Sequence, residues 1–450
     1  MLRTLSLIAL LCLIARAVVV SRRAPESVAP GQTVTIEMSV WGMPWESALY
    51  TESYIPEFER QNPGIKVRFA NFEDYPNRIL LSHAGGIAPD VIRMNTAFAE
   101  GWLRRGLALP LDTYIDGPDG IDRNDFIPVT WQGVQHDGRT WGVPQDINML
   151  GLYYNKALFD KAGLAYPNAS WTWDDLKRAA DALTVDKDKD GHPETVGLDT
   201  AWNMFYYQPL VYQAGGHFWN ADKTRVEVSG PEGVEALRFM KSLMRRYTLT
   251  QSNSTRGGLG PDKFFEQGRL GMLIDGSWRA PSLKGNAPGL QFGAAPLPGH
   301  KTAITTGGSC FWAVSSQSRH PDAAWKLVKF LSSKEALRQY WQQLWVAPPA
   351  RWSVLRSEDF RNVTGMPGSI PGLPRSEWQE KCGWLQLCLE ESRVTVESAG
   401  PYAEIMGLYV GKAVDRVLLE GADPVRELRQ AQHQANARIG QAGPLGGATE

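Results

Sequence analysis

The pattern of apolar and polar positions predicts alternating strands and helices. Residues 33–40 read Thr-Val-Thr-Ile-Glu-Met-Ser-Val, a strict alternation that predicts a β-strand. A helix is expected over 47–60, because Asn-Pro-Gly at 62–64 is a strong helix breaker. Residues 65–69 then alternate again. A strand, a helix and a second strand in succession form a βαβ unit, which favours an α/β fold.

The same reading continues toward the C-terminus. Residues 89–94, 149–154 and 271–274 predict further strands of the buried type. Thr172 opens a Thr-Trp-Asp-Asp sequence that predicts a capping box, with Asp in the place of the usual Glu. The Asp-Pro pair at 423–424 predicts the cap and first residue of a C-terminal helix.

The N-terminus carries the longest apolar run. Residues 5–15 form an apolar run in which Ser6 is the one polar residue, and Arg3 precedes it, as in a secretory signal peptide. Arg16 interrupts the run and no small-residue cleavage site stands out, so an uncleaved membrane anchor stays open as an alternative. We expect residues 1–30 to be a signal peptide or anchor with a spacer. The remaining chain is expected in the periplasm or elsewhere outside the cytoplasm, released or tethered.

Charge and cysteine content limit the kinds of ligand and partner that we expect. The chain has 47 Lys and Arg against 48 Asp and Glu, a net charge of -1, so no strong field is available to gather nucleic acid or anionic lipid. No C-x-x-C pair or His cluster predicts a zinc site, and we expect no cofactor. Cys382 and Cys388 could bridge a short loop, which sequence alone does not decide.

Six segments occur in the order of a known family. The most specific of them, 265–278, reads Phe-Glu-Gln-Gly-Arg-Leu-Gly-Met-Leu-Ile-Asp-Gly-Ser-Trp. With these segments the chain resembles the extracellular solute-binding family that includes maltose- and oligosaccharide-binding proteins of ABC importers. The other five segments are 58–67, 88–91, 143–164, 171–176 and 296–331.

The resemblance implies an α/β, two-lobed periplasmic-binding-protein fold of type II. Each lobe would be a mixed sheet flanked by helices, and the ligand would lie in the cleft between them. Mapped onto this chain, the N-terminal lobe holds 32–143 and 307–340, and the C-terminal lobe holds 150–300 and 345–450.

Three segments would cross between the lobes, near 143–150, 304–308 and 344–348. Gly307 and Gly308 suit a hinge, because glycine absorbs changes of backbone angle without a Cβ penalty.

Aromatic residues indicate a sugar as the ligand. The chain has 17 Trp, many in loops, and the C–H faces of a pyranose ring stack on aromatic planes. Trp278 matches the family position that stacks on sugar and is the strongest candidate. Trp41 follows the first strand, although Trp45 could face the cleft in its place. At least one of Trp202 and Phe205 is expected at the ligand. Tyr402 is a further candidate for which a structural role is an equal alternative.

Polar candidates for the sugar hydroxyls lie at strand ends and in the first crossing segment. Asn95 ends a predicted strand and Asp146 lies in the crossing segment, where a carboxylate can accept two hydroxyls. Glu46 is a weaker candidate, and Asp275 could equally shape the turn before Gly276. Asn203 and Gly308 complete the predicted ligand-binding set.

One motif resembles the opening of a calcium loop. Asp186, Asp188 and Asp190 alternate before Gly191, but Gly197 stands where a bidentate Glu should be. A solvated turn is therefore favoured, with a weak calcium site as the alternative.

The function expected from the sequence is solute capture without catalysis. No G-x-S-x-G, H-E-x-x-H or P-loop motif is present. We expect a monomer that captures a sugar or oligosaccharide by lobe closure and delivers it to the permease subunits of an ABC importer. The alternatives are a carbohydrate-active enzyme, the same fold binding a non-sugar solute, and a chemosensory receptor.

Overall fold

The computed structural model describes residues 32–189, 193–247, 260–396 and 402–442. The predicted signal or anchor at 1–30 and Asp190 of the calcium-like motif lie outside the described residues. In the described part of the chain, no helix combines the length and the apolar character needed to cross a bilayer.

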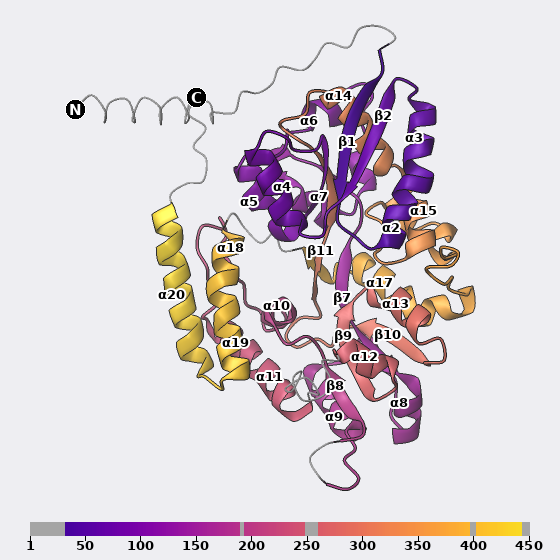
Figure 1. The fold of residues 1–450 in the computed structure, drawn as a ribbon. Coiled ribbons are helices and arrows are strands. Elements are labelled where there is room, and N and C mark those ends of the chain that lie inside the picture. The colour runs from indigo at the N-terminus through magenta and orange to yellow at the C-terminus, as the bar shows by residue number, and fades with distance from the viewer. Residues whose placement is uncertain (1–31, 190–192, 248–259, 397–401, 443–450) are drawn as a thin grey trace, which may run out of the picture.

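The N-terminal sheet has five strands in the order β2-β1-β3-β12-β6. Figure 1 shows β1 and β2 of this sheet side by side. β1 pairs in parallel with β2 and β3, whereas β12 is antiparallel to β3, so the sheet is mixed. The predicted βαβ unit is confirmed by the parallel pairing of β1 and β2. The strands are β1 (Val34–Val40), β2 (Ile65–Asn71), β3 (Val91–Asn95), β6 (Val143–Pro144) and β12 (Cys310–Val314).

The helix between β1 and β2 is longer than predicted. It begins at Pro44 and runs through α2 (Pro44–Leu49), a π-helical turn η1 (Tyr50–Tyr54) and α3 (Ile55–Gln61). Proline is tolerated in the first turn of a helix, which is why Pro44 begins the helix and does not break it. The early start brings Glu46 onto a helix that directly follows the end of β1.

The second sheet has the order β13-β11-β7-β9-β8, and β10 also pairs with β7. β8 is parallel to β9, while β7 runs antiparallel to β9, β10 and β11, so this sheet is mixed as well. Its strands are β7 (Asn148–Asn155), β8 (Val196–Asp199), β9 (Leu270–Gly276), β10 (Phe292–Pro296), β11 (Thr305–Gly308) and β13 (Val394–Val396).

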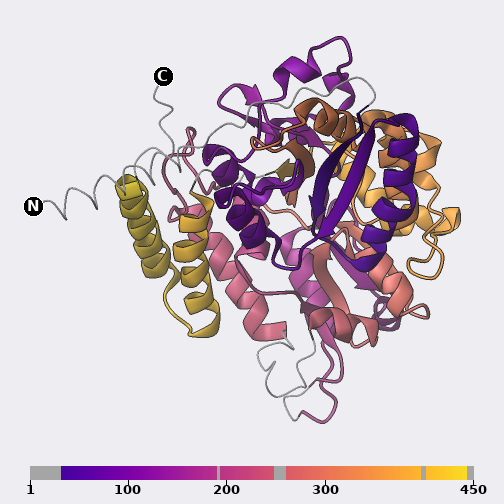
Figure 2. The ribbon, with the colours of Figure 1, turned by 45° about the horizontal axis from the view of Figure 1, so that its top comes forward.

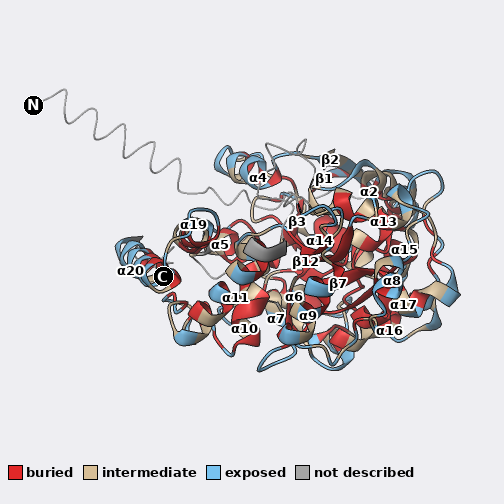
Figure 3. Ribbon diagram, turned by 90° about the horizontal axis from the view of Figure 1, so that it is seen from below, coloured by how far each residue is buried: buried red, intermediate tan, exposed pale blue. Residues whose placement is uncertain are grey.

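Helices cover both sheets, and the strands lie in the interior. β7 and β12 run through the buried centre of the molecule (Figure 3). A separate apolar cluster joins α10, α11, α19 and α20, and the last two form an outer edge of the molecule (Figure 2). The remaining longer helices are α4 (Tyr75–Ala84), α5 (Thr96–Arg104), α7 (Pro128–Gly133), α8 (Lys156–Ala162), α9 (Trp173–Leu183), α10 (Met204–Gln213), α11 (Pro231–Tyr247), α12 (Pro261–Glu266), α13 (Arg279–Asn286), α14 (Pro321–Leu331), α15 (Lys334–Leu344), α17 (Arg375–Glu390), α19 (Lys412–Leu419) and α20 (Pro424–Ala442). Shorter elements are β4 (Gln135–His136), β5 (Arg139–Thr140), α6 (Asp112–Ile115), η2 (Arg123–Asp125), α16 (Trp352–Leu355), η4 (Glu358–Arg361), α18 (Ala403–Met406) and η5 (Gly407–Gly411).

The structure decides two local features that the sequence raised. Thr172 accepts a hydrogen bond from the Asp175 amide, and Asp175 accepts one from the Thr172 amide in return, which confirms the capping box of α9. Cys382 and Cys388 are free and buried in the single helix α17, so the structure holds no disulfide between them.

The chain passes between the two sheets at three neighbouring places. The segment 145–147 joins β6 to β7, Ser309 joins β11 to β12, and 345–350 follows α15. The three are hydrogen-bonded together: Gln145 N donates to Cys310 O at 2.8 Å, and Ile147 N donates to Pro348 O at 2.9 Å. We refer to these residues as the crossing segments.

Gly307 and Gly308 were expected at a hinge, but they lie within a strand of the second sheet. Both belong to β11 and pair with β7 of the second sheet, so the crossing comes at Ser309. A Cβ atom on Gly307 would lie 2.3 Å from the main-chain oxygen of Asn148. Close approach of two strands therefore accounts for glycine at 307.

Candidate ligand-binding cleft

A cleft of about 1000 Å³ opens between the two sheets. The carboxyl ends of β1, β2 and β3 contribute to it from the N-terminal side, and α13 and the start of β7 contribute from the other. Ligands of open α/β sheets bind beyond the carboxyl ends of the strands. Four of the predicted ligand-binding residues line this cleft: Trp41, Glu46, Asp146 and Trp278.

Aromatic rings form much of the cleft wall. Trp41 follows β1, and its ring centroid lies 4.9 Å from that of Tyr75. Both Trp41 and Trp45 line the cleft, so the choice between them that the sequence left open does not arise. Phe72, which follows β2, is a third aromatic residue of the same wall and was not predicted.

Trp278 follows β9 and lines the cleft from the side of the second sheet. A Cβ atom on Gly276 would lie 2.1 Å from the Trp278 ring, so the glycine of the Asp-Gly-Ser-Trp turn is what lets the indole lie over the backbone. The Phe205 ring is 6.3 Å from the Trp278 ring, and 38% of Phe205 is exposed. Phe205 therefore lies beside the cleft wall without lining the cleft.

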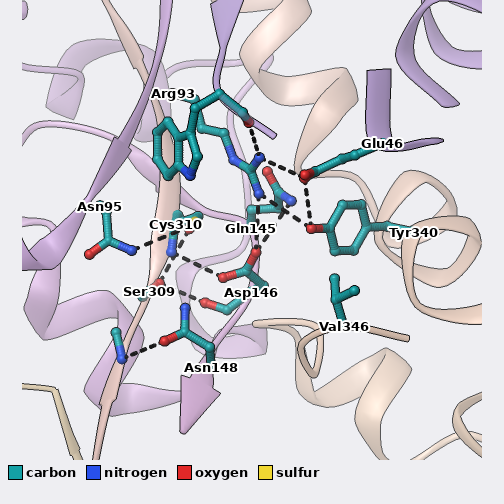
Figure 4. Close-up of polar contacts among 12 residues, drawn as sticks. Glu46, Arg93, Asn95, Gln145, Asp146, Asn148, Ser309, Cys310, Tyr340 and Val346 are labelled. Atoms are coloured by element: carbon teal, nitrogen blue, oxygen red, sulfur yellow. Dashed lines mark hydrogen bonds and ion pairs between the residues drawn. The ribbon is translucent and has the colours of Figure 1, made fainter. Parts of the chain in front are cut away.

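The floor of the cleft is a buried ionic network centred on Arg93 (Figure 4). Arg93 is only 3% exposed, and its Nη1 donates to Glu46 Oε1 at 2.6 Å. Its Nη2 donates to the Tyr340 hydroxyl at 3.3 Å and lies 3.7 Å from Asp146 Oδ2. Tyr340 in turn donates to Glu46 Oε1 at 3.0 Å. Burial of these charges is tolerated because each is paired.

Asp146 is the most enclosed member of the floor. Its Oδ1 accepts from the Cys310 amide at 3.0 Å, and its Oδ2 accepts from Gln145 Nε2 at 3.3 Å. Burial raises the pKa of Asp146 to about 6, although Arg93 and the Cys310 amide act in the opposite direction. Both oxygens already have protein partners, so Asp146 lines the floor chiefly as part of the network.

Two predicted polar residues lie near the crossing segments, outside the cleft lining. Asn95 caps α5, since its Oδ1 accepts from the Ala97 amide at 2.9 Å. Its Nδ2 lies 3.6 Å from the Cys310 sulfur. Gly308 donates its amide to Asn148 Oδ1 at 3.1 Å. Asn148 itself lines the cleft and is a candidate that the sequence reasoning missed.

The remaining candidates have structural partners on the second sheet's side. Trp202 donates to Asp199 Oδ1 at 2.7 Å and lines a small separate pocket beside α10. Asn203 caps α10 through the Phe205 amide at 2.9 Å.

Asp275 and Tyr402 also contact other parts of the fold and not the cleft. Asp275 accepts from Arg279 Nε at 2.7 Å and from the Gly276 amide at 2.7 Å, which fits the turn-shaping alternative. Tyr402 packs against the apolar cluster of the C-terminal helices. Neither residue lines the cleft.

The calcium-like motif gains no metal-binding partners in the described structure. Over the described ranges, no group of three or more His, Cys, Asp or Glu side chains is arranged to hold a metal ion. Asp190 lies outside those ranges, so this finding covers only Asp186 and Asp188 of the motif.

Arg93 and Tyr340 are the principal floor residues that sequence reasoning missed. Arg93 lies in β3 between the apolar residues Ile92 and Met94, and Tyr340 lies on α15, far along the chain. A lone arginine in a predicted buried strand was the available signal, because a buried charge requires a partner.

The comparisons with known proteins agree with this geometry. Residues 45–337 match the family described as bacterial extracellular solute-binding protein. The chain belongs to this family. The two-lobed α/β fold is also that of a solved ABC substrate-binding protein of Listeria monocytogenes in complex with cycloalternan. That structure gives a TM-score of 0.77 at 23% identity over 91% of this chain and 100% of the other, and it confirms the predicted fold class.

Relatives from other bacteria match over similar lengths. A multiple sugar-binding protein of Streptococcus mutans is 25% identical over 303 residues, which are 64% of this chain and 69% of the relative. A Brucella abortus protein named only as a binding protein is 29% identical over 310 residues, 67% of this chain and 72% of the relative. This solute-binding protein thus shares its family with proteins of several bacterial groups.

Proposed function

We propose that this solute-binding protein captures a sugar or oligosaccharide and delivers it to the permease subunits of an ABC importer. The observation that supports this most is the set of aromatic residues that line the cleft from both sides: Trp41, Trp45 and Phe72 from one side and Trp278 from the other. Such rings stack on the C–H faces of a pyranose, while Asn148 and Glu46 lie within the same cleft for its hydroxyls. The sugar-binding names of relatives support the same ligand class.

Capture would proceed by closure of two lobes about the crossing segments. In this proposal the lobes correspond to the two sheets with their helices, close to 32–143 with 307–340 and 150–300 with 345–450. A ligand that contacts both walls only in the closed arrangement shifts the population toward closure. The protein would act outside the cytoplasm without catalysing a reaction, as a monomer, either released or tethered by residues 1–30.

A thermal-shift screen with a panel of neutral sugars tests the proposal first. A bound ligand stabilises the folded protein by RT ln(1 + [L]/Kd), so binders raise the melting temperature. Calorimetry on the best binder, with wild type and Trp278→Ala, then tests the stacking role. We expect the variant to bind about 30-fold more weakly or worse, as for an aromatic hot spot.

Trp352→Ala is the matched control, because Trp352 lies on α16 against Arg356 and outside the cleft. The control should bind as the wild type does. Unchanged affinity in Trp278→Ala would contradict the stacking assignment. Release of products from oligosaccharides by the purified wild-type protein would instead favour the enzyme alternative.

A further inference from the structure

The cleft lining has more negative than positive side chains, and they differ in how far a ligand could reach them. Among the described residues, the cleft lining holds three carboxylates, Glu46, Glu73 and Asp146, and one cation, Arg93. Glu73 is exposed at the rim, whereas the other three form the buried floor.

Both terminal nitrogens of Arg93 already have partners, and its Nε, which has none among the described residues, is buried. Its Nη1 donates to the Trp41 carbonyl at 3.1 Å and to Glu46, and its Nη2 is engaged with Tyr340 and Asp146. The guanidinium also lies 4.8 Å from the centre of the Trp41 ring, which covers one of its faces. A carboxylate or phosphate entering the cleft would have to displace a buried, charge-assisted pair before it could reach this cation.

Glu46 keeps one oxygen for a ligand. Oε1 accepts from both Arg93 and Tyr340, while Oε2 has no hydrogen-bond partner within the described structure. The side chain is 9% exposed and lines the cleft. Gly42 makes room for Oε2, since a Cβ atom at 42 would lie 2.3 Å from it. The carboxylate is thus held through Oε1, while Oε2 lies beside Gly42 in a side chain that lines the cleft.

We propose that the cleft ranks sugars by charge, admitting neutral and amine-bearing sugars and excluding acidic ones, and that Glu46 sets this ranking. This rests on the proposed function. An acidic sugar would meet Oε2, which has no hydrogen-bond donor within the described structure. The described lining of the cleft holds three carboxylates against one cation, and like charges in a partly enclosed cleft repel far more strongly than in water. A protonated amine would pair with the same oxygen and lie against the aromatic wall, which also attracts cations.

Matched oligosaccharides that differ in one group test the ranking. Calorimetry would compare the α-1,4-linked galactose trimer with α-1,4-linked trigalacturonate, and cellotriose with the β-1,4-linked glucosamine trimer. We expect the uronate to bind about 10- to 100-fold more weakly than the neutral trimer of its linkage, and the glucosamine trimer at least as tightly as cellotriose. Raising the salt concentration to about 1 M, where the Debye length is about 3 Å, should shrink the part of both differences that comes from the exposed Glu73. Charges enclosed in the cleft are screened much less.

Variants then assign the effect to particular carboxylates. Glu46→Gln should reduce the discrimination between neutral and acidic trimers about tenfold. Glu73→Gln, which leaves the buried network intact, should reduce it to a smaller extent and decides the matter if Glu46→Gln fails to fold. Glu52→Gln removes an exposed carboxylate in η1, outside the cleft, and should leave the discrimination as in wild type.

The outcomes separate the two proposals. Uronates that bind as tightly as neutral trimers would overturn the charge ranking while leaving sugar capture intact. Discrimination that is unchanged in both cleft variants would overturn the role of Glu46. If neither these trimers nor any sugar of the panel binds, the proposed function fails and the charge ranking fails with it.

Discussion

Replacing Asp146 with Asn should stabilise the protein increasingly as the pH rises from about 4 to about 7. Asp146 is 1% exposed, and burial is the largest influence on it, raising its pKa from 3.8 to about 6. Between these values the folded protein holds a proton that the unfolded chain has released. Wild-type stability therefore falls through this window as the pH increases. Asn keeps an oxygen for the Cys310 amide and has no such titration.

The expected size follows from the shift itself. One pKa unit corresponds to 1.36 kcal/mol, so a rise from 3.8 to about 6 makes the ionised carboxyl cost about 3 kcal/mol in the folded state above pH 6. The free energy of unfolding of Asp146→Asn minus that of wild type should therefore grow by up to about 3 kcal/mol across the window. Taking this difference cancels the other titrating groups that the two proteins share.

Urea unfolding at several pH values, followed by tryptophan fluorescence and circular dichroism, measures this difference. Asp415→Asn, an exposed position on α19, is the control and should give a flat difference. The groups that face Asp146 are Arg93 from β3, Glu46 from α2 and Cys310 from β12. If the Arg93 attraction outweighed burial, the pKa would be lowered and the difference would fall with pH, which would refute the reasoning.

Two further predictions concern the packing of the second sheet. Gly307→Ala should destabilise the protein by about 1–3 kcal/mol in urea unfolding, because its Cβ would meet the Asn148 main-chain oxygen. Gly64→Ala is the control, because a Cβ at 64 meets nothing within 4 Å. Equal destabilisation by the two substitutions would contradict the explanation. Burial raises the pKa of the Cys382 and Cys388 thiols, so both should resist alkylation in the native protein and react in denaturant without a reductant. Mass spectrometry reads the labelled sites, and failure to react in denaturant would indicate a disulfide.

Strands were the part of the fold that the sequence predicted best. The alternation of apolar and polar residues predicted β1 and β2, and the order of strands and helices indicated the α/β class. The reason is physical, because a strand with a buried face must repeat every second residue. The start of α2 at Pro44 was missed, since proline is compatible with both a turn and the first turn of a helix.

The site was predicted less completely than the fold. Trp41, Trp202 and Trp278 each follow the end of a strand. Trp202 nevertheless donates to Asp199 and lines a separate pocket, so a place beyond a strand end did not decide which of the three lines the cleft. Loop side chains have no period that fixes their direction. The Arg93 network was hidden for a different reason, since its partners come from elements that are brought together only by the packing of the sheet.

Asp146 connects the cleft floor to the crossing segments, and this explains why a charged residue is retained at so buried a place. Its main-chain oxygen accepts from Ser309 Oγ at 2.7 Å, its side chain accepts from the Cys310 amide, and it pairs with Pro349 in a short antiparallel bridge. All three crossing segments therefore meet at this residue, while its other carboxylate oxygen lies 3.7 Å from Arg93. A ligand group that binds Glu46 acts on Arg93 through a 2.6 Å contact, so the path from the ligand to the crossing segments is two ion pairs long. Because a buried ionic network favours a few discrete arrangements, we expect ligand binding at Glu46 and the relative orientation of the two sheets to be energetically coupled.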